Sequence, residues 1–240
     1  MGISVDSAVD VAKESADIIL LRKSLHVLYE GVDEGRRTFT NIMKYLRMGS
    51  SSNFGNMFSV VGASIFLPFL PMAPVQIILN NFLYDMSQLG IPTDNVDQEE
   101  LLKPAKWNMD NIKNFMLYIG PVSSIYDYLT YFTLFFFLRV PAEVFHAGWF
   151  IESIMTQTLV IHVIRTNKIP FLESKPSKFL LFTSILIVSV ALLIILTPLR
   201  TYFGFEALPG EFFPILIVFV ITYLILTQLV KMWLLKRKII

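Results

Sequence analysis

Six runs of mostly apolar residues, each long enough to cross a lipid bilayer, constrain this chain more than any other feature. A membrane-spanning helix needs roughly 17 to 25 such residues. The runs lie near residues 49–70, 73–91, 112–138, 147–164, 179–197 and 212–233. Only 16% of the 240 residues are charged, whereas soluble domains have about 25%. We therefore expect an all-α membrane protein with six transmembrane helices over residues 49–240.

The distribution of basic residues predicts how these helices are oriented. Lys and Arg gather before the first run, between the second and third, between the fourth and fifth, and after the sixth. The remaining connections hold only Arg139 and Arg200. Because basic residues are retained on the cytoplasmic side, we expect a multi-pass protein of the plasma membrane with both termini in the cytoplasm. The net charge of +1 gives no reason to expect a nucleic-acid partner, and the absence of cysteine excludes disulfides and thiolate metal sites.

The first 48 residues have a different character. Residues 3–5 favour a strand, a helix capped by Asp6 or Ser7 should run to about Glu14, and the apolar residues 16–21 favour a second strand. Strands that are apolar on both faces usually lie in a parallel sheet covered by helices. Residues 1–24 are too few to supply such layers, so we expect a small incomplete α/β stub that packs on another polypeptide or is the remnant of a domain that the chain has lost; the alternative is a stub that folds independently. Residues 25–48 predict a cytoplasmic stalk helix, or a plain amphipathic linker.

Polar residues in the first two runs predict a cation site between them. Asn53 and Asn56 share one face of the first helix, and Asn81, Asp85 and Gln88 form one stripe on the second. A carboxylate inside a bilayer costs roughly 2.5 kcal/mol or more, and such groups usually mark an ion path. We expect Asp85 to be buried at mid-bilayer depth and flanked by the amides of the preceding helix.

Three polar residues occur in the third and fourth runs. Asp127 belongs either to an ion route or to a carboxyl group bonded to Ser123, Ser124 or a neighbouring helix. Glu152 falls near the outer interface, where we expect it to be hydrated. Gln157 lies deep enough in the fourth run to face the cation site.

Several segments of the chain resemble one family closely. They are GISVDSAVDVAKESADIILL, EGRRTFTNIMKYL, SSNFGN, LNNFLYDMSQLGIPTDNVD, KPAKWN and GWFIESIMTQTLVIHVIRT. Together they resemble the C-terminal part of P-type cation-transporting ATPases, most closely the magnesium-transporting ATPases of bacteria. The resemblance covers essentially the whole chain. It implies that residues 1–24 correspond to the end of the phosphorylation domain and that the six spans correspond to family helices five to ten.

The resemblance also implies a ligand set, because the family binds its cation with residues of helices four, five, six and sometimes eight. The matching positions in this chain are Asn53 and Asn56 on helix five, Asn81, Tyr84 and Asp85 on helix six, and Gln157 on helix eight. Of these, Asp85, Asn81, Asn53 and Asn56 are the implied metal ligands. One carboxylate among amides suits Mg²⁺, which keeps several waters beside one or two carboxylates. Sodium or proton coupling is the alternative.

Parts of the family pattern are absent from these 240 residues. The phosphorylated Asp-Lys-Thr-Gly motif, the nucleotide pocket, the Gly-Asp-Gly magnesium loop and the Pro-containing break of helix four do not occur. We therefore expect no catalytic residues, no ATP hydrolysis by this chain alone, and half of the ion site to be missing. The leading hypothesis is the C-terminal membrane half of a magnesium-transporting P-type ATPase, with Mg²⁺ as the transported ion and ATP acting only through a separate N-terminal half. The alternatives are a non-catalytic membrane subunit or regulator that pairs with a full-length pump, and a passive six-span cation channel.

Overall fold

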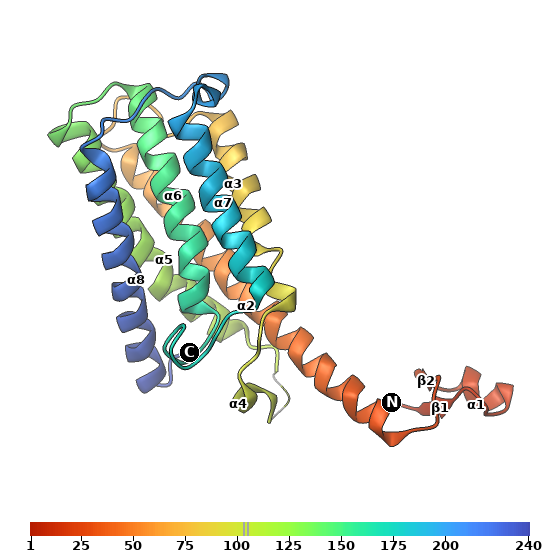
Figure 1. Ribbon diagram of the computed structural model, residues 1–240. Helices are drawn as coiled ribbons and strands as arrows, with labels where there is room; N and C mark the ends of the chain where they lie inside the picture. The colour runs from red at the N-terminus through yellow and green to blue at the C-terminus, as the bar shows by residue number, and fades with distance from the viewer. Residues whose placement is uncertain (103, 105) are drawn as a thin grey trace.

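The computed structural model describes residues 1–102, 104 and 106–240. Lys103 and Ala105, which belong to the segment KPAKWN, lie outside the described residues. Most of the chain forms a bundle of long helices, and a small N-terminal unit stands apart from the bundle at the end of a projecting helix (Figure 1).

The N-terminal unit contains the two predicted strands. Strands β1 (Ile3–Val5) and β2 (Ile18–Leu20) pair in parallel, with Ile3 opposite Ile18, and helix α1 (Asp10–Glu14) connects them. The helix ends at the predicted residue but begins later than expected, and its N-cap is Val9 rather than Asp6 or Ser7. Ile18 and Ile19 are 39% and 41% exposed, so the described chain does not cover this sheet as parallel sheets are normally covered.

Helix α2 (Leu25–Ala63) joins this unit to the bundle without a break. The hydroxyl of Ser24 caps its first turn by accepting a hydrogen bond from the His26 N–H. At 1.5 Å per residue its 39 residues are about 58 Å long. Figure 1 shows the first half projecting from the bundle and the second half packed inside it. One helix therefore connects the part that is rich in charge with the apolar part.

Five further long helices complete the bundle within the described residues. They are α3 (Pro74–Gln88), α5 (Met109–Phe132), α6 (Ala142–Ile164), α7 (Lys178–Leu196) and α8 (Phe212–Lys236), with a short α4 (Gln98–Leu101), a π-helical segment (Thr133–Phe137) and two 3₁₀ segments (Ile91–Thr93 and Pro198–Phe203) in the connections. Helix α6 lies at the centre, in contact with α3, α5, α7 and α8. Among the described residues, three helices are long and apolar enough to cross a membrane, namely α6, α7 and α8.

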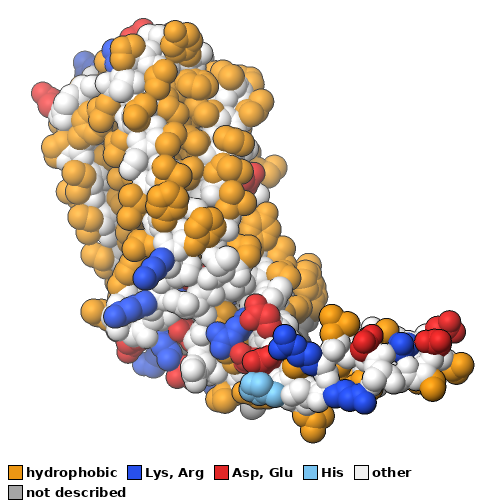
Figure 2. Space-filling view, turned by 45° about the vertical axis from the view of Figure 1, so that its right-hand side comes forward, with side chains coloured by type: hydrophobic (Ala, Val, Ile, Leu, Met, Phe, Trp, Pro, Cys, Tyr) orange, Lys and Arg blue, Asp and Glu red, His pale blue; other side chains and the backbone are white. Residues whose placement is uncertain are grey.

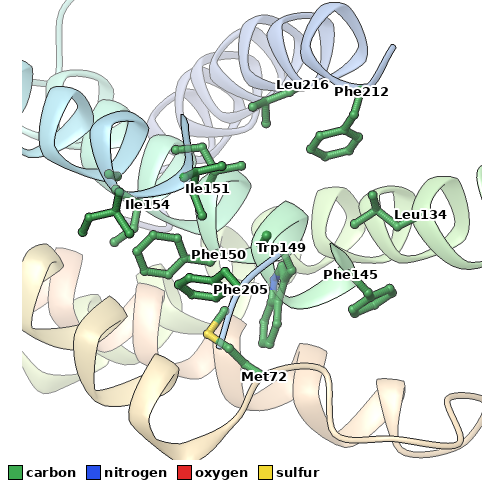
Figure 3. Close-up of a cluster of buried hydrophobic side chains, with 14 of the residues drawn as sticks. Met72, Leu134, Phe145, Trp149, Phe150, Ile151, Ile154, Phe205, Phe212 and Leu216 are labelled. Atoms are coloured by element: carbon green, nitrogen blue, oxygen red, sulfur yellow. The ribbon is translucent and has the colours of Figure 1, made fainter. Parts of the chain in front are cut away.

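Two features hold the bundle together. The first is an apolar cluster on α6, where Phe145, Phe150 and Ile154 are fully buried among side chains from the neighbouring helices (Figure 3). The second is a close approach of α2 to α5 at Gly55, whose backbone C=O accepts a hydrogen bond of 3.0 Å from the Ser124 hydroxyl. Only glycine fits at this position, because a Cβ atom there would lie 2.8 Å from the backbone oxygen of Gly120.

The surface divides by side-chain type along the length of the molecule. In Figure 2, hydrophobic side chains cover most of the bundle, while Lys, Arg, Asp and Glu gather at its lower end and on the N-terminal segment. Large apolar side chains such as Ile78, Phe82 and Ile185 are more than half exposed. A soluble monomer rarely exposes such a continuous apolar surface, so this distribution agrees with a bundle surrounded by lipid.

Candidate cation site

Three of the expected asparagines line one cavity of about 410 Å³ between α2 and α3. Asn53 and Asn56 are three residues apart on one face of α2, and Asn81 comes from α3 on the other side of the cavity. Asn80 and Ser153 add two further polar side chains, and the indole of Trp149 closes the wall toward the bundle. The structure therefore places these three amides around one cavity, which opens on the outer face of the bundle at Asn53 and Asn81.

The amides that face this cavity are not satisfied within the chain. Among the described residues, no hydrogen bond joins the side chain of Asn53, Asn56 or Asn81 to another group of the chain; Asn53 and Asn81 are exposed and Asn56 is half-buried. Asn80 donates one long bond of 3.5 Å to the Ser153 hydroxyl, and its buried Oδ1 atom has no partner among the described residues. Buried amides are normally hydrogen-bonded, so the buried Asn80 oxygen is available to a ligand, and the amides of Asn53, Asn56 and Asn81 stand unpaired at the mouth of the same cavity.

Asp85 differs from the expectation. We expected a buried carboxylate, but the Asp85 side chain is exposed and lies in a neighbouring groove of about 450 Å³ with Asn41, Tyr45 and Gln88. Asp85 follows Asn81 by one helical turn, so both lie on the same stripe of α3. Asn81 and Asp85 face outward because the described chain packs no helix over them, whereas Gln88, the third residue of the predicted stripe, is buried. The predicted pocket with Asp85 enclosed by amides is not formed by this chain alone.

Tyr84, on the inner side of α3, and Gln157 of α6 lie inside the bundle. Both are buried and border a space of about 10 Å³, which has no room for a hydrated cation. The Ser52 hydroxyl donates to the Gln157 Oε1 atom at 2.9 Å, and the Gln157 side-chain amide donates to the Ser153 hydroxyl. Gln157 therefore reaches the asparagine cavity only through Ser153.

Sequence reasoning missed three residues of the cavity wall. Asn80 precedes the predicted Asn81, and Trp149 and Ser153 lie two and one helical turns before Gln157 on α6, respectively. The spacing of four residues between Ser153 and Gln157 could have pointed to Ser153, whereas nothing in the sequence pattern places Trp149 at the cavity.

The donor set of the cavity consists of amide and hydroxyl oxygens. Among the described residues, no group of three or more His, Asp or Glu side chains is close enough together to hold a metal ion. Hard cations such as Mg²⁺ take oxygen ligands, and Mg²⁺ commonly keeps several waters. The asparagine amides can therefore contribute to a Mg²⁺ site, but they need additional oxygens, above all from a carboxylate.

A second polar cluster lies at the charged end of the bundle and is fully paired. The completely buried carboxylate of Asp94 accepts bonds from the Lys44 ammonium at 2.9 Å and from the Arg165 guanidinium at 2.7 Å. It also accepts the backbone N–H of Ser177 at 3.1 Å. Burial lowers the pKa of Lys44 below its ordinary value, although the Asp94 carboxylate opposes the shift. This cluster ties α2, the segment after α3, α6 and the start of α7 to one another.

The two acidic residues of α5 and α6 are also inside the bundle. Asp127 accepts a hydrogen bond from Ser59 of the neighbouring helix α2, so the expectation of a partner on another helix is confirmed. Ser123 and Ser124 donate instead to the backbone C=O groups of Gly120 and Gly55, respectively. The expected hydration of Glu152 is wrong, because Glu152 is only 1% exposed. The position of Glu152 near the end of an apolar run suggested the interface, but α6 is surrounded by other helices along its length.

Comparison with known proteins adds the family context. Residues 69–233 match the family model that describes the C-terminus of cation transporting ATPases. The chain is 49% identical over 235 residues, 96% of its length, to the magnesium-transporting ATPase, P-type 1, of Salmonella typhimurium strain LT2, and equally identical to the protein of that name from Escherichia coli K12. A calcium-transporting ATPase of Bacillus subtilis is 30% identical over 93 residues, which is 38% of this chain and 10% of that protein. The chain spans about a quarter (26%) of the length of the magnesium-transporting relatives.

Proposed function

The chain belongs to the cation-transporting P-type ATPase family, and from that premise we propose that it acts as the C-terminal membrane part of a magnesium transporter. In this role it supplies the α2 and α3 side of an intramembrane Mg²⁺ site. ATP hydrolysis belongs to the other segments of such a transporter, which contain the phosphorylated aspartate and the nucleotide pocket.

The membrane arrangement that we propose has six spans. Helices α6, α7 and α8 meet the length and apolarity of a span, and the second half of α2, α3 and α5 pack beside them in the same bundle. We place both termini on the cytoplasmic side, with residues 1–24 as the end of a phosphorylation domain and residues 25–48 as the stalk. Lys and Arg at the end of the bundle that holds the C-terminus favour this orientation (Figures 1 and 2).

The single observation that carries the proposal is the cavity with unsatisfied amides. Asn53, Asn56 and Asn81 converge on about 410 Å³ and make no hydrogen bonds with other described residues. Asn53 and Asn81 are exposed and Asn56 is half-buried in the described chain. An amide without a partner in an apolar environment is costly, so once lipid or another segment covers this face, the three amides gain from a ligand with a positive charge. Mg²⁺ is the ion that the names of the two relatives at 49% identity indicate.

The exposure of Asp85 defines what the site still needs. Asp85 lies in the groove next to the cavity on the same outward face of α3. In our proposal another transmembrane segment of the transporter covers this face and turns the two hollows into one enclosed site. Asp85 then supplies the carboxylate that the asparagine cavity lacks, while Tyr84 and Gln157 stiffen the wall behind it.

The test is ATP-driven Mg²⁺ uptake in cells that depend on an added magnesium transporter. The chain is expressed together with the N-terminal segment of a magnesium-transporting relative. We expect uptake with the unchanged chain and loss of uptake with Asp85→Ala. Asp110→Ala, which removes an exposed acid at the start of α5, is the control and should leave uptake intact. Undiminished uptake with Asp85→Ala would refute the site assignment.

A non-catalytic subunit that binds a full-length pump is the second candidate function. The exposed apolar side chains of Ile18 and Ile19 on the N-terminal sheet favour it, because they need a covering surface. Affinity purification of the chain from membranes that contain a full-length pump separates the two functions. Recovery of an intact pump with the chain supports a subunit, whereas uptake that requires only the two complementary segments supports the first proposal.

A further inference from the structure

Two carboxyl groups meet inside the bundle, on the side of α2 that faces away from the exposed groove of Asp85. Asp127 of α5 is 3% exposed and Glu152 of α6 is 1% exposed, and their side chains are within hydrogen-bonding reach of each other. Neither residue belongs to the cation ligands proposed above. Apolar residues of similar size would pack the interior of the bundle better than a pair of acids. Packing alone therefore does not explain why the two acids are there.

The two carboxyl groups have different surroundings. Asp127 accepts two strong hydrogen bonds, from the Trp149 indole N–H at 2.7 Å and from the Ser59 hydroxyl at 2.6 Å. The Oε2 atom of Glu152 has no partner among the described residues. The Thr156 hydroxyl, one turn further along α6, lies close to the Glu152 carboxyl but donates to the backbone C=O groups of Glu152 and Ser153. The donors around the pair therefore stabilise a negative charge on Asp127 more than on Glu152.

The groups facing the pair carry no positive charge. The titratable side chains that interact with it are Tyr128 and Tyr131 of α5 and Tyr223 of α8. Helix α2 contributes the hydroxyl of Ser59, and α6 adds the indole of Trp149 and the hydroxyl of Thr156. Among the described residues, no Lys, Arg or His side chain is in contact with either carboxyl group. Two carboxylates in contact cannot both be ionised without a compensating cation, and the cost is greater inside a bilayer than in water.

We propose that Asp127 and Glu152 form a proton-binding site in the bundle that holds one proton between them. Glu152 carries the proton and donates it to the Asp127 carboxylate, which the indole and the hydroxyl hold in place. The site is separate from the asparagine cavity, but Trp149 contacts both, because its ring lines the cavity and its N–H binds Asp127. This proposal does not rest on Mg²⁺ being the ion in the cavity.

Infrared spectroscopy of the full chain in lipid tests the proposal directly. A protonated carboxylic acid has a C=O stretch that a carboxylate lacks, and exposed Asp and Glu side chains are ionised at neutral pH. We expect this band at pH 7 in the unchanged chain and its loss in Glu152→Gln, where an amide of the same shape replaces the protonated acid. Glu143→Gln alters an exposed acid on the same helix and should leave the band intact. Absence of the band, or its persistence in folded Glu152→Gln, overturns the proposal.

Two further variants keep the test informative if Glu152→Gln fails to fold. In Asp127→Asn the band of Glu152 should remain but shift in frequency, because its acceptor changes from a carboxylate to an amide. In Trp149→Phe the Asp127 carboxylate loses one donor, so the protonated band should persist to higher pH than in the unchanged chain. An unshifted band in Asp127→Asn would show that the proton is elsewhere, and an unchanged pH range in Trp149→Phe would exclude the role of the indole.

Discussion

The asparagine cavity and the Asp94 cluster are both built from polar residues of α2 and its neighbours, but they differ in completeness. Asp94 receives Lys44, Arg165 and a backbone N–H, so its carboxylate is fully paired within the chain. Asn53 and Asn81 line an open cavity and have no partner among the described residues. The contrast separates polar residues that hold the helices together from polar residues that are left available for a ligand or a covering segment.

The largest effect on stability should follow from breaking the Asp94 cluster. Arg165→Ala leaves the buried Asp94 carboxylate without its shorter ion pair, and we expect the free energy of unfolding to fall by about 3–5 kcal/mol. Denaturant unfolding in detergent micelles measures this change. The control is Arg37→Ala, which removes a part-exposed ion pair with Asp33, one turn earlier on α2. This change should cost no more than about 0.5 kcal/mol. Equal effects for the two variants would show that the Asp94 cluster is not a structural centre.

A smaller loss should follow from separating α2 and α5 beside the cavity. In Gly55→Ala the new Cβ would clash with the Ser123 Oγ atom and lie 2.8 Å from the Gly120 oxygen, so we expect a destabilisation of about 1–3 kcal/mol. Gly49→Ala on the same helix meets no atom within 4 Å and should stabilise the chain by up to about 1 kcal/mol. Thermal unfolding followed by circular dichroism compares them, and equal changes in both variants would contradict the close approach.

Asp97 lies beside the Asp94 cluster, because Ser174, which donates to Asp97, also accepts a hydrogen bond from Arg165. We expect Asp97 to make the stability of the chain depend on pH in the acidic range. Burial alone would raise the pKa of Asp97, but hydrogen bonds from Ser174 and Thr166 and the charge of Arg165 lower it below its ordinary value. Because the folded pKa is the lower one, this contribution to stability is present above the ordinary pKa of about 4 and is lost as the pH falls through the folded value. Unfolding measured from neutral to acidic pH should show a shallower loss for Asp97→Asn than for the unchanged chain. Identical pH profiles for the two proteins would show that ionised Asp97 does not stabilise the folded chain.

The smallest effect on stability should come from the open cavity. Asn53→Ala and Asn81→Ala remove side chains with no described partner, and we expect changes within about 0.5 kcal/mol. The same denaturant measurement applies here. A loss of more than 2 kcal/mol from either substitution would place these asparagines in the structural group with Asp94 and would remove the contrast.

The sequence predicts local features of this chain well because they depend on neighbouring residues. The strand at Ile3–Val5, the apolar strand at Ile18–Leu20 and the shared face of Asn53 and Asn56 follow from residue type and spacing. These features need no knowledge of how the helices are arranged around one another.

The same reasoning fails where the answer depends on which helices surround a residue. Asp85 lies on the predicted stripe, yet it is exposed because the described chain packs no helix over it or over the groove beside it. Glu152 is buried because α6 is the central helix of the bundle. Helical periodicity identifies a common face but not the side of the bundle to which that face turns.

Equilibrium binding of Mg²⁺ to the chain, assembled with the N-terminal segment of a magnesium-transporting relative, tests the central claim most directly. Asn56→Leu keeps the size of the side chain and removes the amide oxygen that lines the cavity. We predict that this change weakens Mg²⁺ binding by at least about tenfold, which corresponds to roughly 1.4 kcal/mol, while unfolding is unaffected. Unchanged Mg²⁺ affinity in folded Asn56→Leu would contradict the account.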